Sequence, residues 1–260
     1  MKMEQAVNPV TAQPARSRAR KFVSTPAGWM ALIVIAVLAT VFAYRPGHGV
    51  APMDLADLPA NQALSVMTYN VEGLPFPVRF GRSSALAAIG ERLQALRATG
   101  RQPHIILLQE AFSNEAAALG AEAGYRFVAA GPSASVAGAQ PTILADRDFA
   151  AASSALRGEV SGKWEGSGLR ILSDYPIVGA RQMAFPSYAC AGFDCLANKG
   201  ALLVEVRIPG MKLPIAVVDT HLNSRHASRA TTGRSLYAWR RQVDALNQFI
   251  EKNRVPGAPL

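Results

Sequence analysis

From Leu64 onward, short β-rich runs alternate with segments of helical periodicity, and this alternation limits the fold more than any other feature of the chain. Five runs are predicted as strands, over residues 64–70, 104–109, 168–173, 200–208 and 213–221. Helices are predicted over 84–98, 114–123 and 235–252. Ser83 and Ser84 are available as N-caps of the first helix. Interleaved strands and helices indicate an α/β fold. The stretch 130–161 is rich in Ala, Ser and Gly, and predicts no element.

The N-terminal region carries a run of seventeen uncharged residues, from Gly28 to Tyr44. A membrane-spanning helix needs about 17–25 apolar residues, and this run has no polar face. Four basic residues between positions 16 and 21 predict a cytoplasmic N-terminus. A cleavable signal peptide is the alternative, since Val41 to Ala43 resembles a cleavage site. We expect an uncleaved anchor, and both interpretations export the rest of the chain to the periplasm or the extracellular side.

The predicted organisation follows from these segments. Residues 1–27 form a basic cytoplasmic tail, 28–44 the transmembrane anchor or signal peptide, 45–63 a proline-rich linker and 64–260 the globular domain. Residues 1–45 hold six Lys or Arg and one Glu, which is more than half of the net charge of +9. The remaining 21 basic and 17 acidic residues suit an anionic substrate or membrane surface without demanding nucleic acid.

The two cysteines, Cys190 and Cys195, have no second pair to complete a zinc site. In an exported domain they suit a disulfide that closes a small loop. Two buried thiols are the alternative, because sequence gives no Cα separation.

Polar residues follow several predicted strands. Asn70 ends the first strand, Gln109 and Glu110 end the second, and His221 ends the last. Strand ends in layered α/β proteins are where reactive side chains converge. A carboxylate, an amide and an imidazole at one edge would suit Mg²⁺ or Mn²⁺. Taken singly, each residue has an ordinary structural explanation, such as a turn cap or a buried core histidine.

Five segments in order resemble the motifs of the endonuclease/exonuclease/phosphatase superfamily: TYNVEG (68–73), HIILLQEAF (104–112), GSGLRILSDYPI (166–177), CLANKGALLVEV (195–206) and DTHLNS (219–224). The superfamily includes nucleases, inositol phosphatases and neutral sphingomyelinases. The SDYPI and NKG segments are most similar to the neutral sphingomyelinase branch. The resemblance implies a four-layer α/β/β/α sandwich of two mixed sheets.

The resemblance also implies roles for particular residues. Glu110 would bind the metal, Mg²⁺ or Mn²⁺, and Asn70 would orient a phosphate oxygen or metal-bound water. His221 would stabilise the phosphoryl transition state or protonate the leaving oxygen. Lys199 lies in a segment that would approach the phosphate, as in the sphingomyelinase branch. Asn223, which follows His221, is a further candidate for phosphate binding that the family motif does not require.

The family's general base comes from a Gly-Asp-x-Asn segment and a final Asp-His pair, and neither occurs in this sequence. We therefore expect a C-terminally truncated domain with an unpaired sheet edge, which by itself folds poorly and is inactive. The leading functional interpretation is a metal-dependent phosphodiester hydrolase acting outside the cytoplasm, with phospholipid or sphingolipid head groups as the favoured substrates. The alternatives are an exported nuclease of the same superfamily and a catalytically dead, membrane-tethered protein.

Overall fold

The computed structural model of the chain describes residues 63–74 and 79–260. The predicted tail, anchor and nearly all of the predicted linker lie outside these residues. Within the described part, no helix has the length and apolar character needed to cross a membrane.

The first sheet has four strands in the order β1-β2-β4-β3. Strands β1 and β2 pair in parallel, and β4 pairs antiparallel with both β2 and β3, so this sheet is mixed as expected. The strand bounds are β1 Val66–Asn70, β2 Ile105–Gln109, β3 Phe127–Ala130 and β4 Arg170–Ser173.

The second sheet has three described strands: β5 Ile177–Ala184, β6 Gly200–Val206 and β7 Ile215–Thr220. Both pairings are antiparallel, so the expectation of two mixed sheets is wrong for this sheet as described. The short connection 207–214 explains the β6–β7 pairing, because a parallel pair needs a crossover of about a dozen or more residues.

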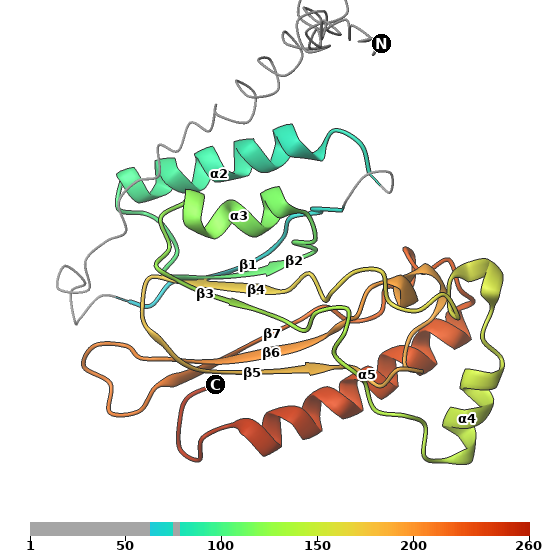
Figure 1. Cartoon of the computed structure of the whole chain (residues 1–260). Coiled ribbons are helices and arrows are strands. Elements are labelled where there is room, and N and C mark those ends of the chain that lie inside the picture. The colour runs from blue at the N-terminus through green and yellow to red at the C-terminus, as the bar shows by residue number, and fades with distance from the viewer. Residues whose placement is uncertain (1–62, 75–78) are drawn as a thin grey trace, which may run out of the picture. The chain divides into compact units, whose positions relative to one another are not determined.

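Helices cover the outer faces of the two sheets. The described helices are α2 Arg82–Ala98, α3 Asn114–Glu122, α4 Leu144–Ala151 and α5 Thr232–Asn253. Figure 1 shows α2 and α3 over the first sheet, and α5 along the outer face of the second. The described domain therefore has the order helices, sheet, sheet, helix, which is the expected layering.

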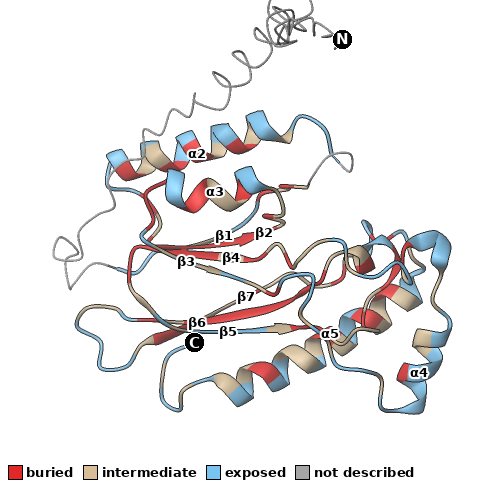
Figure 2. Ribbon diagram, viewed as in Figure 1, coloured by how far each residue is buried: buried red, intermediate tan, exposed pale blue. Residues whose placement is uncertain are grey.

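Alternating side chains on the central strands build these layers, because successive strand residues point to opposite faces. On β2, Ile106 and Leu108 pack toward α2 and α3, whereas Ile105 and Leu107 face the second sheet. Leu202 and Val204 of β6 face the first sheet, and Leu203 packs against Phe249 of α5. Every residue of β2 is buried (Figure 2), which explains its continuous apolar sequence.

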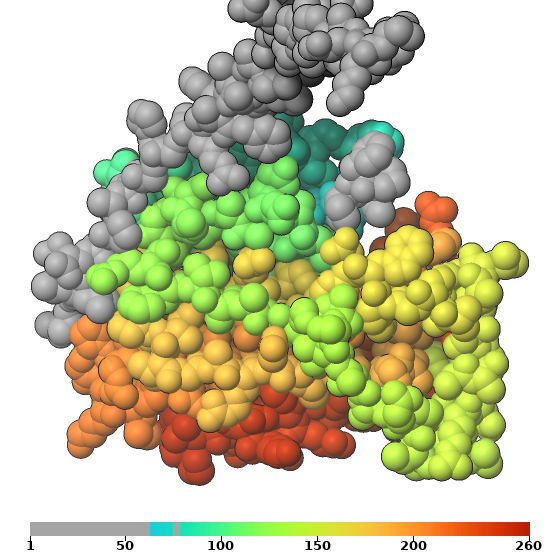
Figure 3. All heavy atoms as spheres, in the orientation of Figure 1, coloured from blue at the N-terminus to red at the C-terminus, as the bar shows by residue number. Residues whose placement is uncertain are grey.

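Two strands and one α-helix were not predicted. Strand β3 and helix α4 lie in or next to the Ala/Ser/Gly-rich stretch, and β5 begins at the last residue of the SDYPI segment. The segment 131–167, which contains α4, stands at one end of the layered domain (Figure 3). The N-cap prediction is wrong as well: α2 begins at Arg82, and its N-cap is Gly81 in the left-handed conformation. Glycine reaches that conformation without the steric penalty of a side chain.

Each of β1 and β7 pairs on one side only among the described strands. Val66 and Tyr69 of β1 belong to the exposed large apolar side chains. Strands β3 and β5 are edge strands as well, as every open sheet has two of them, so the expected C-terminal truncation stays a prediction.

Candidate active site

The parallel strands β1 and β2 end in register, with Asn70 opposite Gln109. The next residue, Glu110, has a backbone φ of 57°, in the left-handed region. Non-glycine residues in this region carry strain of about 1–3 kcal/mol and cluster at functional sites. The turn places the Glu110 side chain at the edge of the sheet, beside the end of β1.

Asn70 fixes this carboxylate. Its side-chain nitrogen donates a hydrogen bond to Oε1 of Glu110 at 2.9 Å. Its side-chain oxygen accepts one from the backbone N–H of Glu72, also at 2.9 Å. Because the two contacts use opposite ends of the amide, they define which end faces Glu110.

His221 approaches the same carboxylate oxygen from the second sheet. It follows β7, and its Nε2 lies 3.8 Å from Oε1 of Glu110. Burial lowers the pKa of His221 to about 4, with a further lowering from the positive charge of Lys199 and an opposing effect from Asp194. The imidazole is therefore neutral at pH 7, so its contact with Glu110 is not an ion pair at that pH. Among the described residues, its Nδ1 is a buried atom without a hydrogen-bond partner.

The structure thus brings Asn70, Glu110 and His221 together. The two predicted phosphate-binding residues, Lys199 and Asn223, instead form hydrogen bonds within the protein. Lys199 is buried, with its amine 3.0 Å from the Asp194 carboxylate and 2.9 Å from the carbonyl oxygen of Leu222. Asn223 is also buried, and its side-chain oxygen accepts a hydrogen bond from the backbone N–H of Ala191 at 2.9 Å. Both side chains already have protein partners, and their contact with phosphate remains a prediction.

A buried polar link between the two sheets lies next to the site. The side-chain nitrogen of Gln109 donates to the carboxylate of Asp219 at 2.6 Å and to the hydroxyl of Thr68 at 3.1 Å. Burial raises the pKa of Asp219 to about 7, against the lowering effect of the Gln109 hydrogen bond. The other oxygen of Asp219 is buried without a partner in the described part of the chain. The hydrogen bond between Gln109 and Asp219 therefore links β2 to β7 close to the strand ends that Glu110 and His221 follow.

The side chains at this edge fit a divalent ion only in part. The described residues contain no group of three or more His, Cys, Asp or Glu side chains arranged to hold a metal. Glu110 does provide a carboxylate that is partly exposed, at 20%, and fixed in direction by Asn70. Mg²⁺ keeps several of its waters and binds through one or two carboxylates. Glu110 thus offers one carboxylate ligand to a hydrated ion.

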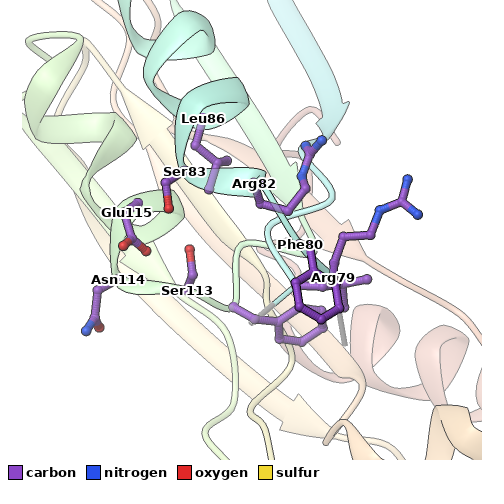
Figure 4. Close-up of a pocket in the computed structure, with 11 residues that line it drawn as sticks. Arg79, Phe80, Arg82, Ser83, Leu86, Ser113, Asn114 and Glu115 are labelled. Atoms are coloured by element: carbon purple, nitrogen blue, oxygen red, sulfur yellow. The ribbon is translucent and has the colours of Figure 1, made fainter. Parts of the chain in front are cut away.

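Two pockets open near the site without including it. A pocket of about 430 Å³ lies between the starts of α2 and α3. Figure 4 shows Arg82 and Ser83 at the start of α2, and Asn114 and Glu115 at the start of α3 with its N-cap Ser113. A second, of about 260 Å³, lies beside residues 165–170, and Phe112 lines both. Asn70, Glu110 and His221 line neither of these two pockets.

The cysteines form a disulfide, with Cα atoms of Cys190 and Cys195 5.2 Å apart. The disulfide closes a small loop that contains the short helix η4 Gly192–Leu196 in part. Of the two interpretations of this pair, the structure shows the bonded one.

The sequence model of the Endonuclease/Exonuclease/phosphatase family matches residues 67–260. The chain belongs to this family. The match covers β1 to the C-terminal residues, and so includes all three converging side chains.

Solved structures similar to this family member include a beta toxin mutant from Staphylococcus aureus with bound magnesium ions, at 22% identity and a TM-score of 0.57. Sphingomyelinase C from Streptomyces griseocarneus is similar at 23% identity and a TM-score of 0.53. These matches cover 76% and 75% of this chain, but only 62% and 61% of the two proteins. They establish a shared fold. No curated protein sequence matches the chain significantly.

One residue of this region was not found from the sequence. Asp194 lies in the disulfide loop and contacts Lys199 and the segment after His221. Its position between two closely spaced cysteines was the available signal, because such a loop can hold a side chain rigidly.

Proposed function

We propose that this chain is a phosphodiester hydrolase that uses Mg²⁺ or Mn²⁺ at Glu110. The observation that carries the proposal is the convergence of Asn70, Glu110 and His221 on one carboxylate oxygen. Membership of the family adds support, since its description comprises nucleases and phosphatases. A divalent cation at this position would neutralise charge on the phosphodiester and lower the pKa of bound water.

The chain's own residues have distinct roles in this proposal. Glu110 would hold the cation. Asn70 fixes the orientation of the Glu110 carboxylate through its hydrogen bond and presents its own amide near a phosphate oxygen. His221, neutral at pH 7, donates a hydrogen bond to the oxygen on which charge develops in the transition state. Protonation of the leaving oxygen by His221 would require an imidazolium, which the low pKa of this histidine disfavours at neutral pH.

Lipid is the substrate class that we propose. The apolar run 28–44 would anchor the chain in a membrane, with the catalytic domain on the exported side. The similar fold of sphingomyelinase C supports a phospholipid or sphingolipid head group. The membrane would thus be both the site of attachment and the source of substrate.

The test uses the full chain in vesicles, with Mg²⁺, Mn²⁺ or a chelator. Release of the phosphorylated head group from sphingomyelin or phosphatidylcholine is compared with cleavage of plasmid DNA. Cation-dependent lipid hydrolysis that is lost in Glu110→Gln supports the proposal. Cleavage of DNA alone would favour an exported nuclease. If the chain is shown to be folded but turns over none of these substrates, the proposed hydrolase function is wrong. A membrane-tethered protein without catalytic activity would then be favoured.

A further inference from the structure

The disulfide loop is bound to the segment that follows His221. The backbone N–H of Ala191 donates to the side chain of Asn223 at 2.9 Å. The backbone N–H of Phe193 donates to the carbonyl oxygen of Ser228 at 3.0 Å. Hydrogen bonds from two loop residues therefore hold the loop against residues 223–228.

Asp194 makes the contacts closest to the histidine. One of its carboxylate oxygens accepts hydrogen bonds from the backbone N–H of Ser224 and from the amine of Lys199. The same amine donates to the carbonyl oxygen of Leu222 at 2.9 Å. Asp194 thus holds the residues directly after His221, once directly and once through Lys199. Both side chains are nearly inaccessible to solvent, at 11% and 7% exposure, where charge-assisted hydrogen bonds are strong.

The opposite side of the loop is also held. The amine of Lys163 donates to the carbonyl oxygen of Cys195 at 2.9 Å. The carboxylate of Glu159 accepts from the backbone N–H of Gly192 at 2.6 Å and from Arg234 of α5 at 2.8 Å. With the disulfide across its base, the loop has little freedom to move, and Asp194 is presented in a defined position.

We propose that Asp194 is a positioning residue, which the Cys190–Cys195 loop holds against residues 222–224 so that His221 faces Glu110. The catalytic consequence of this arrangement rests on the proposed function. The effect on the backbone after His221 does not, because it follows from the hydrogen bonds alone.

A second buried carboxylate provides the matched control. Asp146 of α4 accepts hydrogen bonds from the hydroxyls of Tyr188 and Tyr237 and from Arg241, at 2.7–2.8 Å. It ties α4 to α5, and within the described part of the chain it forms no hydrogen bond or ion pair with residues 221–224. Loss of Asp146 and loss of Asp194 remove comparable buried networks, but only the second network contains the histidine segment.

The experiment measures amide hydrogen exchange in the ¹⁵N-labelled full chain. In Asp194→Ala, we expect the Ser224 amide to exchange about tenfold faster or more, as for loss of one charge-assisted hydrogen bond. Asp146→Ala should leave that amide within about twofold of the wild-type rate. If Asp194→Ala does not fold, Asp194→Asn and dithiothreitol-reduced wild type replace it, and both should show faster exchange at Ser224. Unchanged exchange, or an equal increase in Asp146→Ala, would overturn the proposal.

The kinetic arm separates this inference from the proposed function. With an active wild type, Asp194→Ala should lower kcat with little change in KM, and Asp146→Ala should not. Unchanged kcat in Asp194→Ala, despite faster exchange at Ser224, would overturn the positioning of His221. A folded but inactive wild type would overturn the proposed hydrolase, while the exchange result would still decide whether Asp194 holds the segment.

Discussion

The side-chain amide of Asn70 donates a 2.9 Å hydrogen bond to Oε1 of Glu110, although forty positions separate the two residues in the chain. The parallel pairing of β1 with β2 makes this contact, because it aligns Asn70 with Gln109 and leaves Glu110 at the turn. His221 approaches the same oxygen from the other sheet, at 3.8 Å. Three segments of the chain therefore meet at one carboxylate oxygen of Glu110, so Glu110 is the first residue to replace.

Replacing Glu110 with Gln removes the negative charge but keeps the shape of the side chain. We expect kcat for phosphodiester hydrolysis to fall by about 10²–10³, together with loss of Mg²⁺ dependence. Glu91→Gln, an exposed change on α2, is the control and should leave both unchanged. Steady-state kinetics across a Mg²⁺ titration measure the effect. Retained, Mg²⁺-dependent activity in Glu110→Gln would remove Glu110 from the site.

Replacing His221 with Ala removes the imidazole from the same edge. The expected decrease in kcat is about 10²–10⁴, the range for a residue that acts on the reacting atoms. His226→Ala is matched in chemistry, and His226 is exposed five positions further along. Single-turnover rates on the preferred substrate provide the comparison. Equal rates for the two variants would argue against a catalytic role for His221.

Asp219→Asn tests the buried link between the sheets through the pH dependence of stability. The pKa of Asp219 is raised by burial to about 7 in the folded chain, against an ordinary value of 3.8. Its contribution to stability is therefore present at low pH and is lost as the pH rises through about 7. The wild-type free energy of unfolding, relative to that of Asp219→Asn, should fall between pH 5 and pH 8 by on the order of 2 kcal/mol.

The lowered pKa of His221 has the opposite effect, since folding then favours the neutral imidazole. Stability from His221 is lost as the pH falls from about 6.5 toward 4. Both proteins contain this histidine, so the effect cancels in their difference. Urea unfolding at the two pH values provides the measurement. A difference independent of pH would show that Asp219 is ionised in the folded chain at both.

Arg97, in the last turn of α2, forms a buried ion pair with Asp174. The nitrogen and oxygen are 2.6 Å apart, and the two side chains are 4% and 2% exposed. Arg97→Ala leaves the Asp174 carboxylate buried without its cation, and should lower the free energy of unfolding by about 3–5 kcal/mol. Arg181→Ala removes an exposed arginine that lies 3.9 Å from Glu205, too far for a strong ion pair, and should cost less than about 1 kcal/mol. Chemical denaturation compares the two variants. A loss below about 1 kcal/mol for Arg97→Ala would contradict the buried-pair assignment.

Local patterns predicted the elements that are buried on one or both faces. The run HIILLQ has few alternatives to a central strand, and it forms β2 with every residue buried. The amphipathic stripe of 235–252 lies within α5, which extends to Thr232–Asn253. The stretch 130–161 lacks such a pattern because its contacts are polar and distant in sequence. Asp146, for example, pairs with Arg241, 95 positions away, and no local periodicity encodes that bond.

The sequence by itself determined the α/β class, the family, and the residue types at the strand ends, because hydrophobic periodicity and ordered motifs are local properties of the chain. Only the tertiary structure decided that Asn70, Glu110 and His221 share one oxygen, that Lys199 pairs with Asp194, and that Cys190 bonds to Cys195. It also decided the pKa of His221 and of Asp219, since burial, which sequence does not give, dominates both. Distance and desolvation depend on how two sheets stack, and that stacking follows from side chains far apart in the chain.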